Sequence, residues 1–292
     1  MLVTILVILV VLLLFLAAFV LLRTVRFARP QPMTAALEER LDVDPKKALA
    51  HLTQAVQVQT ISYAELEKIN FDALLELHGV LEKAYPKTHK ALQREVIGGS
   101  LLFTWPGSRP ELPGVLLTGH LDVVPVDPET LDKWSHPPFS GAVEDEMIHG
   151  RGVLDDKGSV VAILEAVEGL VAAGHRPERT IYLGFGQDEE ISGTLGAREI
   201  AKRLEGRGVT LEAVLDEGGA VVEGAIPGVE GRVALVGTAE KGYVSLKLRA
   251  EGAGGHSSAP PARMAVYGLA RALALLVETP FPARLEGVRN MF

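Results

Sequence analysis

The stretch PGVLLTGHLD, residues 113–122, decides the fold of this chain. Its apolar run Gly114 to Thr118 lies between Pro113 and the pair Gly119-His120, which is typical of a buried β-strand. After this run, helical and strand patterns alternate along the chain, which predicts an α/β fold with a mixed, mostly parallel sheet and helices on both faces. The predicted elements are a helix through Val160 to Leu170 that ends at Gly174, a strand at Thr180 to Phe185, a helix at Thr194 to Leu204 and a strand at Leu211 to Leu215.

Acidic residues and one histidine follow these predicted strands. Because sites form at the carboxyl ends of parallel strands, we expect these side chains to meet at one edge of the sheet. Imidazole and carboxylate ligands, with a spare carboxylate as base, are what a hydrolytic metal site requires. The series is His120, Asp122, Asp155, Glu189, Glu190 and then Asp216 or Glu217.

Each motif also has a plain structural interpretation. His120 and Asp122 could form a surface ion pair, and the acids at 188–190 could belong to a solvated loop. Asp155 or Asp156 could cap the helix that follows. Taken together, however, these carboxylates would form an unpaired negative cluster that costs several kcal/mol unless cations neutralise it. The combined pattern therefore favours a metallohydrolase.

Composition limits the alternatives. The chain has 292 residues, 48% of them hydrophobic, which is enough for one large domain or two. Its net charge is -8 and it carries no basic stripe, so nucleic acid is not an expected partner. Because it has no cysteine, a metal must be held by histidine and carboxylate side chains.

The N-terminus is a separate hydrophobic segment. Residues 2–22 are apolar except Thr4 and would span roughly 30 Å as a helix, which is the thickness of a membrane core. No basic residue precedes Leu2 and no cleavage site is evident, so residues 1–25 are predicted to be an uncleaved anchor rather than a signal peptide. Three arginines follow the apolar segment and favour a cytoplasmic location for its C-terminal flank, but the side of the membrane stays open. If the helix were cleaved, the protein would be secreted.

The rest of the chain divides into a linker, a large domain and the start of a second one. Residues 26–44 are predicted to be a linker with a short helix at Ala35 to Leu41. Residues 45–237 form the N-terminal part of a catalytic domain. It begins with helices at Pro45 to Val58 and Glu65 to Ala84.

The pattern changes after Gly237. Apolar and polar residues alternate in Tyr243 to Ala250, which predicts a half-buried strand, and a helix is expected at Ala262 to Glu278. One strand and one helix bury too little surface to be stable alone. We therefore expect residues 238–292 to be the start of a smaller α+β domain, and the chain to be a fragment of a longer protein.

Several segments together resemble a known family. They are GHLDVVPV, WSHPPFSG, GRGVLDDKGS, GQDEEISGTLGA, LDEGG and EKGYVSLKLRAEGAGGHSSAPP. These resemble the di-zinc metallopeptidases that include aminoacylase, carboxypeptidase G and carboxypeptidase S, over about Lys46 to Phe292. The nearest branch is that of the N-fatty-acyl-amino-acid synthase/hydrolase and carboxypeptidase S. The resemblance implies a zinc exopeptidase-like fold with a lid domain through which two subunits form a homodimer.

The resemblance also implies a role for each site residue. His120 would bind one zinc ion, Asp155 would bridge two, and Glu190 would bind the second, with Co²⁺ or Mn²⁺ as substitutes. Family members differ in the remaining ligand, so both Asp216 and Glu217 are kept. The catalytic roles fall to Asp122, which would orient His120, to Glu189 as base and acid, and to His256 as an oxyanion donor to the partner's site. Relatives have a cis peptide bond at the position of Asp155-Asp156.

One departure from the family concerns the second metal. The family's fifth ligand is a late histidine, and no histidine follows His256 in this sequence. We therefore expect these residues alone to be inactive. The predicted reaction of the complete enzyme is cleavage of the amide bond of N-acyl amino acids or short peptides. The alternatives are a carboxypeptidase or dipeptidase of the same family, and a membrane-anchored zinc-binding protein without catalysis.

Overall fold

The computed structural model describes residues 2–27, 43–238, 242–252, 254–256, 258 and 264–282. The chain divides into two compact units, Met1–Glu217 and Gly218–Phe292. This division lies earlier in the sequence than the change of pattern at Gly237. The predicted short helix at Ala35 to Leu41 lies outside the described residues.

A five-stranded sheet forms the centre of the first unit, in the order β1-β2-β6-β3-β7. β3 runs parallel to both β6 and β7, whereas β2 runs antiparallel to both β1 and β6. The expected mixed sheet is confirmed, but it is less parallel than predicted because a hairpin that the sequence reading missed forms one edge. The strands are β1 Gln93–Ile97, β2 Ser100–Trp105, β3 Gly114–His120, β6 Ile181–Gly186 and β7 Leu211–Leu215.

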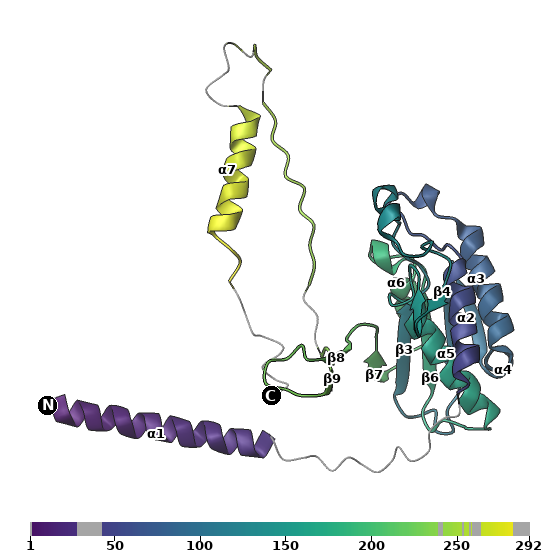
Figure 1. Cartoon of the computed structure of the whole chain (residues 1–292), viewed down its shortest axis with the longest axis horizontal. Coiled ribbons are helices and arrows are strands. Elements are labelled where there is room, and N and C mark those ends of the chain that lie inside the picture. Colours follow the sequence, from purple (N-terminus) through teal and green to yellow (C-terminus); the bar gives the residue numbers. More distant parts are fainter. Residues whose placement is uncertain are drawn as a thin grey trace. The chain divides into compact units, whose positions relative to one another are not determined.

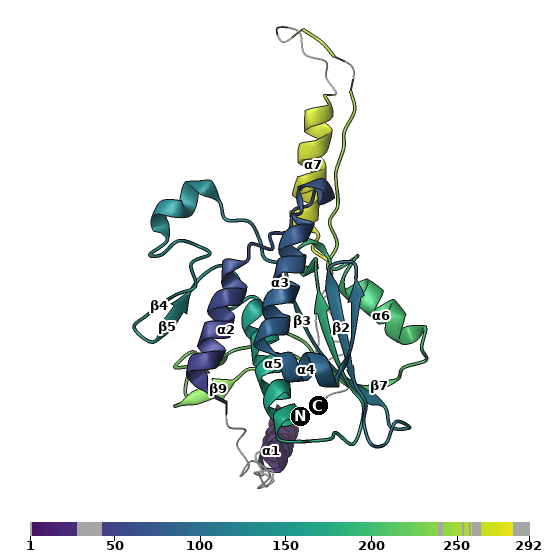
Figure 2. The ribbon, with the colours of Figure 1, turned by 90° about the vertical axis from the view of Figure 1, so that its right-hand side faces the viewer.

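Helices cover both faces of this sheet, as predicted (Figures 1 and 2). Alternate residues of β2 show the two sides: Leu101 and Phe103 belong to the large core under α2, α3 and α5, and Leu102 packs with Ile200 and Leu204 of α6. The helices are α2 Pro45–Gln57, α3 Phe71–Ala84, α4 Pro86–Ala91, α5 Lys157–Ala172 and α6 Ala197–Glu205.

Local sequence signals explain most of these boundaries. Asp44 caps α2 by accepting the backbone N–H of Lys46 at 3.0 Å, with Pro45 in the first helical turn. The helix predicted from Glu65 is split, because Asn70 caps a new start by accepting the N–H of Ala73 at 3.3 Å. Between Glu65 and that cap, the described residues form only the short 3-10 helix η1, Leu66–Lys68.

The hairpin of β1 and β2 was not predicted, although a glycine pair in the sequence marks it. Gly98 has a φ of +61° at the turn, a left-handed conformation that glycine adopts without strain. Gly99 follows it, so the two strands are joined by a two-residue glycine turn. A Gly-Gly pair between two apolar runs is a hairpin signature.

Smaller elements complete the first unit. They are η2 Pro128–Lys133, the hairpin of β4 Ala142–Glu144 and β5 Met147–His149, and η3 Glu189–Ile191. The N-terminal helix α1, Leu2–Phe27, is long and apolar enough to cross a membrane by length and composition. A signal sequence would meet the same criteria.

The second unit differs from the sequence prediction in its strands. It contains β8 Val221–Glu223 paired with β9 Arg232–Ala234, and the helix α7 Ala265–Glu278. Residues 243–250 form no strand, and both their apolar and polar side chains are exposed. The physical reason is that a strand requires a hydrogen-bonding neighbour, and the described residues of this unit offer none to this segment. The predicted helix is confirmed from Ala265 onward, while residues 262–263 lie outside the described part.

Candidate metal centre

His120 is the last residue of β3 and the centre of the site. Its side chain is 1% exposed. Its Nε2 lies 2.9 Å from Asp155 Oδ1 and 3.1 Å from Glu217 Oε2. Because β3, β6 and β7 are adjacent and parallel, the residues that follow them meet at one edge of the sheet, as the sequence predicted.

Asp122 holds the other side of the imidazole ring. The Nδ1–H of His120 donates to the backbone carbonyl of Asp122 at 2.9 Å, and the Asp122 Oδ1 lies 3.3 Å from the same nitrogen. This contact fixes the tautomer in which Nε2 is free to bind a ligand. The Asp122 carboxylate also accepts the backbone N–H groups of Glu189 and Glu190 at 3.0 and 3.2 Å. Asp122 therefore connects the end of β3 to η3.

The loop before α5 carries two adjacent carboxylates. The peptide bond between Asp155 and Asp156 is cis, as the resemblance implied. Asp155 is exposed and points to His120, whereas Asp156 is buried. Asp156 occupies the N-cap position of α5 without making a side-chain cap bond, and its Oδ2 instead accepts the backbone N–H of His120 at 3.1 Å. Asp156 therefore stands at the start of α5, but its side chain does not cap the helix, because the carboxylate faces the His120 N–H.

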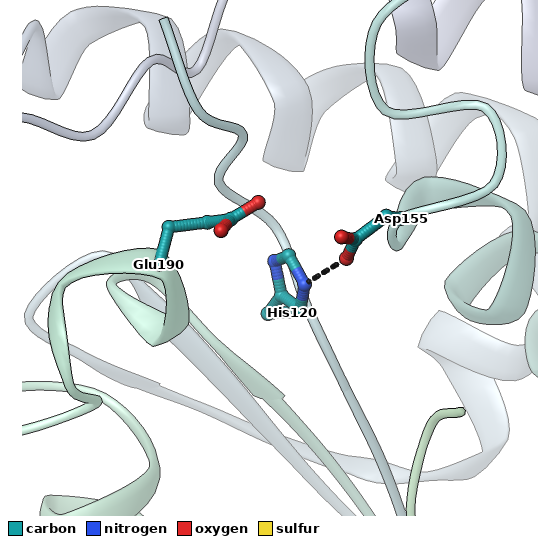
Figure 3. A group of neighbouring side chains, drawn as sticks. All are labelled: His120, Asp155 and Glu190. Carbon is teal, nitrogen blue, oxygen red and sulfur yellow. Dashed lines mark hydrogen bonds and ion pairs between the residues drawn. The ribbon is translucent and has the colours of Figure 1, made fainter. Parts of the chain in front are cut away.

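Figure 3 shows Asp155 and Glu190 on opposite sides of His120, with their carboxylates directed toward the ring. One potential ligand atom from each of these three residues lies within 4.8 Å of the others, and a second such group consists of His120, Asp156 and Glu217. Glu189 belongs to neither group, although its Oε2 comes within 3.9 Å of His120 Nε2. Its side chain is 51% exposed.

The structure distinguishes the two acids after β7. Glu217 faces His120, whereas Asp216 is exposed and accepts the backbone N–H of Glu217 at 2.9 Å. His256 lies in the second unit, where its Nδ1 contacts the hydroxyl of Ser258 at 2.8 Å. Of the predicted site residues in the first unit, all except Asp216 lie together around His120.

The charges in this cluster shift several pKa values. Burial opposes protonation of His120, but the nearby carboxylates of Asp122 and Glu217 outweigh it and raise its pKa to about 12. Burial raises the pKa of Glu189 and of Glu190. Burial, followed by the nearby Glu217, raises the pKa of Asp156 to about 7. The carboxylates therefore favour a positive charge at the position of His120 Nε2.

The donor set fits a zinc ion. It combines one imidazole with carboxylates, which are common zinc ligands. The Glu217 Oε2 is buried and has no hydrogen-bond partner among the described residues, although it lies 3.1 Å from His120 Nε2. A buried carboxylate oxygen without a donor is unfavourable unless a cation binds it. Residues His120, Asp155, Glu190 and Glu217 could hold such a cation.

Sequence reasoning missed two buried side chains beside the site. Ser62 donates its hydroxyl to Asp122 Oδ2 at 2.5 Å. Lys157 donates its Nζ to the carbonyls of Ala55 and Val58 at 2.9 and 2.6 Å, which fastens the Asp155 loop to the end of α2. Burial lowers the pKa of Lys157 to about 7. Ser62 lies in none of the quoted motifs, and Lys157 lies in GRGVLDDKGS without an assigned role, because the partners of both residues lie far away along the chain.

Comparisons with known proteins agree with this chemistry. A family model described as peptidase family M20/M25/M40 matches residues 116–283. The chain is 43% identical over 249 residues to the N-fatty-acyl-amino acid synthase/hydrolase PM20D1 of Xenopus tropicalis, covering 84% of this chain and 48% of that protein. It is 39% identical over 283 residues to the probable carboxypeptidase S-like 2 of Dictyostelium discoideum, covering 93% and 54%.

Human carnosine dipeptidase 1 aligns with a TM-score of 0.48 and 21% identity, over 59% of this chain and 38% of that one. The chain spans about half the length of the curated relatives that it matches.

Proposed function

Because this chain belongs to peptidase family M20/M25/M40, we propose that it acts as a zinc-dependent hydrolase that cleaves the amide bond of N-acyl amino acids or short peptides. The family predicted from the sequence motifs is thereby confirmed. The observation that carries the proposed activity is the position of Glu189, which lies beside the metal-binding residues but belongs to neither ligand group.

The metal would be held by this chain's own side chains. His120 and Glu217 would bind one metal ion, Glu190 would bind the other, and Asp155 would contribute to both. We propose two zinc ions in the complete enzyme, with Co²⁺ or Mn²⁺ as substitutes. Bound zinc lowers the pKa of a water molecule and polarises the scissile carbonyl group.

The proton transfers are assigned to Glu189. Burial raises its pKa, which brings this carboxylate closer to the range in which it can accept and return a proton near neutral pH. Its carboxylate would accept the proton of the attacking water and pass it to the leaving nitrogen. Asp122 would keep His120 in the tautomer whose Nε2 faces the metal. The products are a carboxylic acid and an amine, which is an amino acid when the substrate is an N-acyl amino acid.

His256 is proposed as the oxyanion donor to a partner subunit. The contact of its Nδ1 with Ser258 leaves Nε2 available for a hydrogen bond to substrate. This role rests on the family resemblance and requires a homodimer through the second domain. The apolar helix α1 supports a membrane-anchored enzyme, with the side of the membrane left open.

The names of the relatives suggest two classes of substrate. One relative is named as an N-fatty-acyl-amino acid synthase/hydrolase and another as a probable carboxypeptidase. An apolar acyl group suits an enzyme tethered by α1, so we favour N-acyl amino acids over dipeptides.

The test uses the full-length protein loaded with zinc. Hydrolysis of N-acyl amino acids and of dipeptides is measured for the wild type and for Glu189→Gln, and bound zinc is quantified in both. We expect the variant to keep its zinc and to lose roughly 10²–10⁴-fold in turnover, which is the usual contribution of a general base. Undiminished turnover in Glu189→Gln would contradict the assignment. Bound zinc without turnover in the wild type would favour the non-catalytic binding protein.

A further inference from the structure

Ser62 is a buried serine in the segment that follows α2. Its side chain hydroxyl donates to Asp122 Oδ2 at 2.5 Å, and both residues are almost completely buried. An O–H to carboxylate bond of this length is of the strong, charge-assisted kind. Ser62 is far from Asp122 in sequence, so only the fold creates this contact.

The backbone around Ser62 is fixed against the metal loop. Ile61 forms a parallel bridge with Val123, and the Ser62 N–H donates to the Val123 carbonyl at 3.0 Å. The hydroxyl of Thr60 donates to the Leu121 carbonyl at 2.6 Å. The segment therefore lies along residues 121–123 like a short additional strand, and it directs the Ser62 hydroxyl at the carboxylate.

The Asp122 carboxylate receives contacts from four groups. Three come from the site itself: the His120 ring and the backbone N–H groups of Glu189 and Glu190. Ser62 supplies the fourth, and of the four residues it alone has no proposed role in binding metal or moving protons. Ser62 is therefore the contact through which the segment after α2 can hold Asp122 between β3 and η3.

We infer that Ser62 is a positioning residue of the metal centre, which acts through Asp122 on both His120 and the Glu189-Glu190 turn. The inference rests on the proposed zinc site. Outer partners of metal ligands typically contribute about 10–100-fold to metal affinity, because they hold the ligands in the binding geometry.

The experiment measures zinc affinity of the full-length protein by competition with a chromophoric chelator. Ser62→Ala is expected to weaken zinc binding by about 10-fold, the lower end of the range for direct partners of metal ligands, because Ser62 acts through Asp122. Ser62→Thr, which keeps a hydroxyl, should retain most of the affinity. Ser100→Ala is the matched control, because Ser100 is also fully buried and its hydroxyl has no partner among the described residues. It should bind zinc like the wild type.

Unfolding of the metal-free proteins is followed by tryptophan fluorescence, since Trp105 and Trp134 both lie in the first unit. If Ser62→Ala folds and binds zinc as tightly as the wild type, the inference is overturned. If it does not fold, Ser62→Cys replaces it, because a thiol of similar size is only a weak donor, and unchanged affinity there overturns the inference equally. A wild type that binds no zinc would instead defeat the proposed function itself.

Discussion

Gly119 precedes His120 and offers a sharp test of how tightly the site is packed. A Cβ added at this position would lie 2.5 Å from Asp156 Oδ2 and 3.4 Å from Val160 Cγ2. The first distance is shorter than any normal contact, so the Asp156 carboxylate would have to move. That carboxylate is buried and accepts the His120 N–H at 3.1 Å, so its movement breaks the bond.

The cost of Gly119→Ala follows from these two effects. A buried N–H left without an acceptor costs roughly 1–3 kcal/mol. Overpacking of a dense interior costs roughly another 1–3 kcal/mol. Because the shift that breaks the hydrogen bond also relieves part of the clash, we expect a loss of about 2–4 kcal/mol in the free energy of unfolding, together with weaker zinc binding.

The matched control is the same substitution in a place with free space. Gly79 lies within α3, and a Cβ there would meet nothing within 4 Å. Alanine is favoured over glycine in a helix interior by about 1 kcal/mol, so Gly79→Ala should stabilise the protein. Both variants are measured by urea unfolding of the full chain in a mild detergent, with tryptophan fluorescence as the signal. A Gly119→Ala protein as stable as the wild type would refute the account of the packing around His120.

Four further predictions concern the site and its support. Glu217→Gln should weaken zinc binding by more than the roughly 10–100-fold that an outer partner contributes, whereas Asp216→Asn should change it little; equal effects in a chelator competition would contradict the assignment of Glu217. Removing zinc should lower the free energy of unfolding, and adding zinc at 100 times its Kd should restore about 2.7 kcal/mol of it, measured by thermal unfolding. No change on adding zinc would mean that the folded protein has no zinc site. Phe185→Ala should cost about 3–5 kcal/mol in urea unfolding, since Phe185 is fully buried against Phe103; a loss below 1 kcal/mol would mean that the core is looser than described. Burial lowers the pKa of His78 below 6.5, so the unfolded chain takes up a proton before the folded one does, and the free energy of unfolding should fall as the pH drops below 6.5. In His78→Gln the free energy of unfolding should depend less on pH in this range. An unchanged pH dependence would mean that another group is responsible.

Much of the fold was predictable because its signals are local. The strands β3, β6 and β7 are apolar runs with clear ends, and α5 ends before Gly174, whose φ of +73° suits glycine. The hairpin of β1 and β2 was missed although Gly98-Gly99 marks it. The predicted strand at 243–250 was wrong because alternation describes a side-chain pattern and cannot supply the neighbouring strand that a sheet requires.

The site, like the fold, was predictable where the signal is local and unpredictable where it depends on how distant segments pack. Parallel strands place their carboxyl ends at one edge, so the gathering of His120, Glu190 and Glu217 could be expected from the order of the elements. Asp155 instead comes from the loop between β5 and α5, and β5 lies outside the five-stranded sheet. The choice between Asp216 and Glu217 could not, because adjacent residues after a strand can turn to either side. The three-dimensional structure places Glu217 against His120.

The sequence by itself determined which chemical groups the site contains and which strand ends deliver them, since residue type and hydrophobic pattern are properties of short segments. The tertiary structure alone decided which of these groups touch. Asp156 gives its carboxylate to the His120 N–H instead of capping α5, and Ser62 reaches Asp122 from a segment about 60 residues earlier. The physical reason is that a buried carboxylate takes whichever donors packing brings to it, and packing joins parts of the chain that no local pattern relates.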